Sequence, residues 1–102
     1  MRRLEIKARA RLDLIEIRMH IASESETTAT AVMARLDAAI KNLLLMPGMG
    51  HTHQEVANGR IRFWNVDTFL ITYRYDDASL TILRIIRGKR NLKRMHRRGE
   101  MN

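Results

Sequence analysis

The sequence predicts an α+β fold: an N-terminal strand, an antiparallel helical hairpin, and then a three-stranded antiparallel meander with a basic C-terminal tail. Three observations support this fold. Three strand-like runs between residues 60 and 86 are separated by short turn-forming segments. An amphipathic helical pattern over residues 24–45 ends shortly before a proline. A run of cations follows the last strand-like segment.

The meander is the part around which the rest of the chain is organised. Residues 60–66, 69–75 and 80–86 are rich in the β-branched, aromatic and aliphatic side chains that strands favour. Only Asp67-Thr68 separates the first two runs, and the turn-forming segment 76–79 separates the last two. Links this short join antiparallel neighbours, so the three runs are expected to form successive hairpins.

The N-terminal region predicts one strand and one element of ambiguous type. Residues 2–8 alternate between apolar and charged side chains, as a short strand does. In residues 9–22 the stretch IEIRMHI also alternates, but Leu12, Ile15 and Met19 share one face of a helix. The length of the segment and its lack of Gly, Pro or Asn favour a helix. Its apolar arc would then be too broad for the sheet alone.

A helix over residues 24–45 is predicted by its start, its periodicity and its end. Ser23 and Glu26 fit a capping box, and Pro47 stops the pattern. Apolar residues repeat at spacings of three and four: Ala29, Val32, Met33, Leu36, Ala39, Ile40 and Leu43. We expect this helix to pair with the preceding segment over one face of the sheet, followed by a loop over residues 47–59.

Length and composition indicate one globular domain over residues 1–102, with residues 85–102 as a partly flexible basic tail. The absence of cysteine excludes disulfides, thiolate catalysis and cysteine zinc sites. No apolar run approaches the roughly 20 residues of a membrane span, and the N-terminus has no secretory signal pattern. A cytoplasmic protein without membrane contact is therefore expected.

The positive charge is unevenly distributed along the chain. The net charge is +8, and residues 84–98 contain eight Lys or Arg and no acid, while the remaining bases and acids balance. Such a cluster attracts phosphate backbones or an acidic protein segment, unless it is only a solvated tail. Arg84 and Arg87 fall within or beside a strand, which favours a binding role.

Basic and aromatic side chains also alternate along the first meander strand. Arg60, Arg62 and Trp64 share one side by the two-residue period of a strand. Arg and Trp are enriched where binding energy concentrates; the alternative is a Trp packed under the helices with Arg stems over its rim. Arg74 and Arg84 lie at the ends of neighbouring strands and could extend this surface.

His51, His53 and Glu55 form the only cluster that resembles a metal site, but the pattern is unspecific, and we predict no metal or other cofactor. The same three residues, with His96, are the candidate acid–base groups if the protein cleaves RNA. No local signature of a Ser-His-Asp nucleophile is present.

Four segments, in this order, resemble the small RelE/ParE toxins of bacterial toxin–antitoxin operons. They are ARLDLIEIRMHIA, the loop at Pro47-Gly48-x-Gly50, RIRFWNVDTFLITYR and ILRIIRGKRNLKR, within residues 3–95. The resemblance implies the strand, helical hairpin and meander described above, and it makes residues 9–22 a helix. It also implies one of two activities: cleavage of mRNA in the ribosomal A site, or inhibition of DNA gyrase without nuclease activity.

The matched residues favour the ParE-like branch. RelE-type nucleases carry basic residues on the first meander strand and early in the next, where this chain has Ile61, Phe63 and Leu70. Of the nuclease cations only Arg90 remains, with His96 near the position of an aromatic or imidazole group. Apolar side chains cannot transfer protons or neutralise an oxyanion. The resemblance therefore implies a gyrase inhibitor that is not an enzyme; the alternatives are an mRNA endonuclease and a non-toxic nucleic-acid-binding module.

The resemblance also implies two partner surfaces. Gyrase or its DNA is expected to contact the basic surface: Arg60, Arg62, Trp64, Arg74, Arg84, Arg87, Arg90, Lys93 and Arg94. A ParD-like antitoxin with an acidic amphipathic segment is expected to form a hetero-oligomer with the toxin. It would cover the spare apolar arc of the first helix at Leu14, Ile17 and Ile21.

Overall fold

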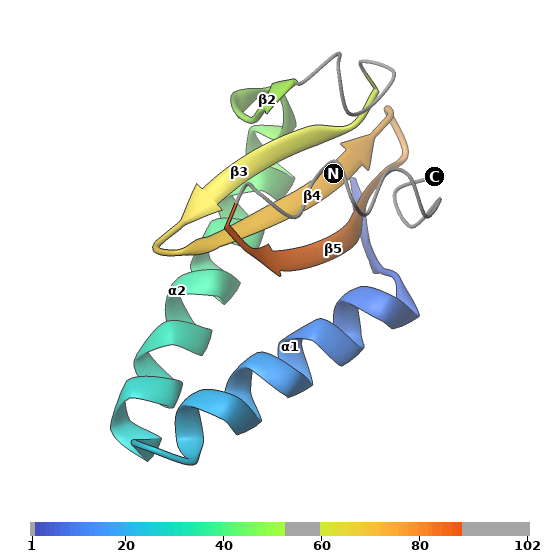
Figure 1. The fold of residues 1–102 in the computed structure, drawn as a ribbon. Coiled ribbons are helices and arrows are strands. Elements are labelled where there is room, and N and C mark those ends of the chain that lie inside the picture. Colours follow the sequence, from blue (N-terminus) through green and yellow to red (C-terminus); the bar gives the residue numbers. More distant parts are fainter. Residues whose placement is uncertain (1, 53–59, 89–102) are drawn as a thin grey trace.

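The computed structural model describes residues 2–52 and 60–88. A sheet with both helices against one of its faces forms the fold (Figure 1). The elements in chain order are β1 (Arg3–Ile6), α1 (Ala8–Ala22), α2 (Glu26–Leu45), the 3₁₀ turn η1 (Pro47–Met49), β2 (His51–Thr52), β3 (Arg62–Val66), β4 (Phe69–Tyr75) and β5 (Ser79–Arg87). The predicted α+β fold is confirmed, and neither helix is long and apolar enough to cross a membrane.

The sheet has the strand order β1-β5-β4-β3-β2. Strands β3, β4 and β5 are antiparallel neighbours, which confirms the predicted meander to within two residues at each boundary. β1 joins one edge parallel to β5, from Arg3 opposite Ser79 to Ile6 opposite Ile82. At the other edge β2 pairs with β3, although this segment was expected to be a loop. The two residues of β2 carry no periodic pattern, because their pairing depends on β3 being beside them.

Residues 9–22 are helical, as the resemblance implied. The start of α2 differs from the prediction: the N-cap is Ser25, whose Oγ accepts from the amide of Thr28 at 3.2 Å. Ser23 has helical dihedrals and its Oγ donates to the carbonyl of His20, so it ends α1 instead. The capping box predicted at Ser23 was therefore two residues too early, because the link between the helices is very short.

The main core lies between the helices and the sheet. Its largest buried side chains come from α2 (Leu36, Leu43) and from β4 and β5 (Tyr73, Ile82, Leu80). All the predicted core positions of α2 are buried except Met33, which is half-buried. A second, smaller cluster comes from the alternate residues of the strands, on the opposite face of the sheet: Ile61, Phe63, Leu70, Leu83 and Ile86.

Candidate functional site

A basic groove lies at the end of the sheet where β3 begins and β4 ends (Figure 1, upper right). Its volume is about 560 Å³, and we call it the arginine groove. It is lined by Arg60, Arg62, Arg74, Tyr75, Asp76, Ser79 and Thr81. Three of the predicted target-binding residues thus come together from two neighbouring strands, although nothing in the fold itself tests their role.

Two arginines are held against the ring of Tyr75. The guanidinium carbon of Arg62 is 5.7 Å from the ring centre, and that of Arg2 is 5.3 Å away. Arg62 Nη1 also donates to the carbonyl of Gly50 at 2.7 Å, and Arg2 Nε donates to the carbonyl of Asp76 at 2.6 Å. These contacts fix the two side chains, because a cation over an aromatic face is attracted to the ring quadrupole.

The loop that supplies the Gly50 carbonyl is fastened by the buried hydroxyl of Tyr73. This hydroxyl donates to the carbonyl of Pro47 at 2.7 Å and accepts from the amide of Gly50 at 2.9 Å. A Cβ at Gly50 would overlap the Tyr73 hydroxyl, so a glycine is needed here. Burial raises the pKa of Tyr73 despite the opposing Gly50 hydrogen bond and the charge of Arg62. The hydroxyl therefore stays protonated and keeps both hydrogen bonds.

Among the residues that the structure describes, Asp76 is the one carboxylate that lines the arginine groove. Its Oδ1 accepts from the amides of Ser79 and Ala78 at 2.9 and 2.8 Å, which forms the predicted turn between β4 and β5. These two hydrogen bonds lower the pKa of Asp76, so it stays ionised at neutral pH. One carboxylate bound to its own turn thus faces three guanidinium groups.

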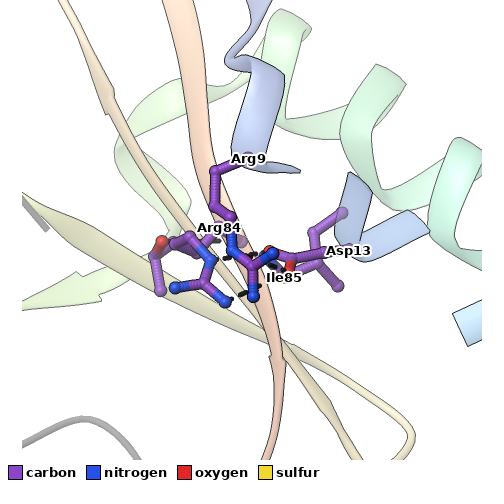
Figure 2. Close-up of polar contacts among 5 residues, drawn as sticks. Arg9, Asp13, Arg84 and Ile85 are labelled. Carbon is purple, nitrogen blue, oxygen red and sulfur yellow. Dashed lines mark hydrogen bonds and ion pairs between the residues drawn. The ribbon is translucent and has the colours of Figure 1, made fainter. Parts of the chain in front are cut away.

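Arg84 does not join this groove, which corrects the sequence-based assignment to the target-binding surface. Figure 2 shows its guanidinium against Asp13 of α1, with Nε 2.8 Å from Oδ2 and Nη2 3.1 Å from Oδ1. Both residues are buried, at 6% and 4% exposure. The side chain is therefore enclosed in the fold and is not presented to a partner.

Asp13 also completes the edge of β5. β1 pairs with β5 only as far as Ile82, and no other described strand lies along the edge beyond that point. The amide of Ile85 donates instead to Asp13 Oδ2 at 2.9 Å (Figure 2). A bulge in β5 immediately precedes Arg84 and Ile85. It lies opposite Thr72 and Tyr73 and leaves Leu83 without a partner in the β4–β5 register. One carboxylate thus binds both a guanidinium and a strand amide.

Two other predicted target-binding residues also lie outside the arginine groove. Arg87 is at the opposite end of β5, with its guanidinium 5.8 Å from the ring centre of Phe69. Trp64 is half-buried against the main core, which agrees with the packing alternative. The remaining three, Arg90, Lys93 and Arg94, lie outside the described residues.

A second, mainly apolar groove of about 260 Å³ lies between α1 and the sheet. We call it the helix groove; its lining residues are Glu16, Ile17, His20, Ile21, Phe69, Ile85 and Arg87. Of the predicted antitoxin contacts, Ile17 and Ile21 line this groove. Leu14 is half-buried against the main core, as the other two are, but it does not line the groove.

The exposed apolar residues of α1 are different from those predicted as contacts. Leu12, Ile15 and Met19 are 42%, 55% and 65% exposed, and their spacing places them on one stripe of the helix. We call them the α1 stripe. The helical periodicity of these residues was visible in the sequence. The face of α1 that points inward, however, is fixed by Ala10 and Asp13, which are both buried. An aspartate is rarely buried unless it is paired, so the sequence alone did not predict this orientation.

The candidate nuclease residues are only partly within the described chain. His51 is exposed on β2, with its ring centre 6.4 Å from that of Phe63. His53, Glu55 and His96 lie outside the described residues. Across residues 2–52 and 60–88, no three His, Asp or Glu side chains gather as a possible metal site.

A comparison with protein families matches residues 4–92 to the family described as the ParE toxin of the type II toxin–antitoxin system parDE. The chain belongs to the ParE toxin family. The resemblance to RelE/ParE toxins, and to the ParE branch, is thereby confirmed.

Among solved structures, the chain is similar to one from the chromosomal ParDE TA system of P. aeruginosa, with 21% sequence identity and a TM-score of 0.74. The match covers 87% of this chain and 98% of the other, and at this identity it shows a common fold. A comparison with curated proteins gives no significant match.

Proposed function

We propose that this ParE-family toxin arrests growth by inhibiting DNA gyrase and is not a nuclease. The observation that carries the proposal is the second hydrophobic cluster. Ile61, Phe63 and Leu70 occupy the positions where the resemblance places the basic residues of a ribosome-dependent nuclease, and they are 6%, 0% and 1% exposed. Aliphatic and phenyl side chains supply neither a proton donor nor a cation for a scissile phosphate.

The proposed target surface is the arginine groove together with the basic residues that follow β5 in sequence. Arg60, Arg62 and Arg74 give the described part of this surface a strong positive potential. Arg90, Lys93 and Arg94 would extend it, and Arg84 is excluded because Asp13 already neutralises it. Inhibition by binding requires such a surface and no catalytic group.

The proposed antitoxin contact is the α1 stripe with the adjoining helix groove. Exposed apolar residues at helical spacing are typical of a partner site. The exposed arginines Arg11 and Arg18 lie on the same helix, which favours an acidic partner segment. We expect an amphipathic acidic segment of the antitoxin to bury the stripe and place an apolar side chain in the helix groove.

The antitoxin contact is tested with Met19→Ser and a matched control. Met19 and Met46 are each 65% exposed, but Met46 lies at the end of α2 and outside the α1 stripe. With the acidic product of the adjacent reading frame as antitoxin, Met19→Ser should weaken binding about tenfold by calorimetry, because a buried apolar contact of 1–2 kcal/mol is lost. Met46→Ser should leave the affinity unchanged. Equal effects of the two variants would contradict the assigned surface.

The function is tested by expression of the toxin without antitoxin. We expect cells to filament and to induce their DNA-damage response, with mRNA intact. The variant His51→Ala/His53→Ala/His96→Ala should remain fully toxic, whereas loss of a catalytic acid or base would reduce a nuclease by about 10²–10⁴-fold. Rapid mRNA cleavage that this variant abolishes would contradict the proposal.

A further inference from the structure

The arginine groove has a lining that is specific to one class of ligand. We propose that it binds the phosphodiester backbone of DNA, so that the toxin engages the DNA that gyrase holds. This inference rests on the proposed function and deepens it, because it names the chemistry recognised at one part of the target surface. The ligand assigned to the groove is a repeating chain of negative charges, and its recognition does not depend on base sequence.

The side chains of the groove suit phosphate oxygens. Arg60, Arg62 and Arg74 supply planar guanidinium groups, which bind phosphate through paired hydrogen bonds. Ser79, at the start of β5, adds a partly exposed hydroxyl group beside them, whereas Thr81 is 5% exposed and forms part of the floor. Arginines and small hydroxyl side chains are the usual partners of the DNA backbone, where they position the duplex without reading its sequence.

The same lining is unfavourable for an acidic protein segment. Its described lining residues include no aliphatic side chain, and a peptide that binds tightly needs buried apolar anchors at the centre of its contact. Ion pairs that remain hydrated contribute little to affinity by themselves. DNA is different, because each phosphate that a cation neutralises releases condensed counterions. The helix groove, with Ile17, Ile21 and Phe69, has the lining that a peptide would need.

The groove is also organised before any ligand arrives. Arg62 is fixed by Gly50 and by the ring of Tyr75, so little side-chain freedom remains to be lost when a phosphate binds. Arg2, on the same ring, adds a fourth cation at the margin. The carboxylate of Asp76 reduces the potential, but its Oδ1 already accepts hydrogen bonds from the two turn amides.

The test compares purified full-length variants in binding a fluorescent 20-base-pair duplex between 50 and 200 mM NaCl, without gyrase. The groove variant is Arg60→Gln/Arg74→Gln; Arg62 is kept because it also holds Gly50. The control is Arg35→Gln, which removes an exposed arginine of α2 that pairs with Asp67 in the turn between β3 and β4, at the other end of β3 from the groove. Thermal unfolding by circular dichroism checks that each variant is folded.

The groove variant should lose about two units of the slope of log K against log salt, about one for each arginine removed. Its affinity at 100 mM salt should fall at least tenfold, whereas Arg35→Gln should match the parent chain. Arg74→Lys should retain the slope, because a lysine still neutralises a phosphate as a point charge. The cations beyond residue 88 are the same in every variant, so the difference reports the groove.

Equal slopes for the groove variant and the control would overturn the inference. A groove-dependent slope for single-stranded RNA but not for DNA would overturn it too, as would groove-dependent binding of a polyglutamate peptide alone. Failure of the proposed function is a separate outcome, since it is measured with gyrase. If the parent chain binds DNA through the groove yet leaves gyrase unaffected, the DNA site stands and the gyrase proposal fails.

Discussion

Two groups of arginines on one sheet have opposite surroundings. Arg84 is buried at the edge of β5, where Asp13 binds it through two nitrogen atoms (Figure 2). Arg60, Arg62 and Arg74, at the end of the sheet where β4 ends, line an open groove in which Asp76 is the one carboxylate among the described lining residues. The residue type is the same, but Arg84 holds the fold together, whereas the groove arginines line a surface that we propose receives an external anion.

The contrast between Arg84 and the groove arginines shows that a cluster of basic residues in the sequence does not predict where positive charge is exposed on the folded protein. Arg84 belongs to the stretch 84–98, whose eight bases and no acids match the net charge of +8, yet its charge is neutralised inside the protein. The residues of the arginine groove come from a part of the chain whose charges sum to zero. What decides the role of each cation is the acid and the amount of water beside it in the folded protein.

The largest effect is expected when the buried pair is broken. Asp13→Ala leaves the Arg84 guanidinium and the Ile85 amide without their buried acceptor, so the free energy of unfolding should fall by about 3–5 kcal/mol. Urea denaturation measures this. The control is Asp37→Ala, which breaks the exposed pair with Lys41 and should cost less than about 0.5 kcal/mol. Similar losses for both variants would erase the contrast between buried and exposed pairs.

An intermediate effect is expected at the support of the arginine groove. Tyr73→Phe removes the hydroxyl that binds Pro47 and Gly50, so the free energy of unfolding should fall by about 1–3 kcal/mol. Because the pKa of Tyr73 is raised in the folded protein, the stability that its hydroxyl contributes depends on pH. Because the unfolded tyrosine loses its proton first, near its ordinary value of 10.0, stability is present below that pH and is lost above it.

Denaturation between pH 9 and 11 measures this dependence. The parent chain should lose stability more steeply than Tyr73→Phe, which lacks the titrating group. If Tyr73→Phe lost stability with rising pH as steeply as the parent chain does, Tyr73 would not be the source of the pH dependence.

The smallest effect on stability is expected within the groove itself. Arg74→Gln should change the free energy of unfolding by less than about 0.5 kcal/mol, because Arg74 is only partly buried and lines the open groove. Arg84→Gln should cost several times more, since the buried Asp13 then keeps only the longer ion pair with Arg9, at 3.8 Å, to balance its charge. Thermal unfolding of the two variants at matched pH compares them directly. A large loss for Arg74→Gln would make the groove a structural element.

The fold was largely predictable because its signals are local. The residues of β3, β4 and β5 and the core face of α2 follow from periodicity and short turns, and the Asp76 turn was correctly identified. The choice between strand and helix for residues 9–22 needed the family resemblance. The parallel pairing of β1 with β5 and the two-residue β2 depend on distant partners, so no local pattern predicts them.

The candidate site was predictable only in part. Strand alternation placed Arg60 and Arg62 on one side of their strand, and Arg74 was a possible extension of that surface, but the fate of Arg84 could not be predicted. Asp13 lies 71 residues away from Arg84, so only the tertiary structure brings them together. The exposed stripe of Leu12, Ile15 and Met19 was not among the predicted antitoxin contacts for the same reason, because the buried aspartate that turns it toward solvent could not be foreseen. Long-range pairs of polar residues are what sequence periodicity cannot supply.

The most direct test of the proposed function is a gyrase assay with the purified toxin. Gyrase, relaxed plasmid and ATP are incubated with the toxin, and the DNA is then treated with detergent and protease. We predict that supercoiling stops and that linear DNA appears from trapped cleavage complexes, in proportion to toxin concentration. Unchanged supercoiling, together with cleavage of mRNA by the same preparation on translating ribosomes, would contradict the account.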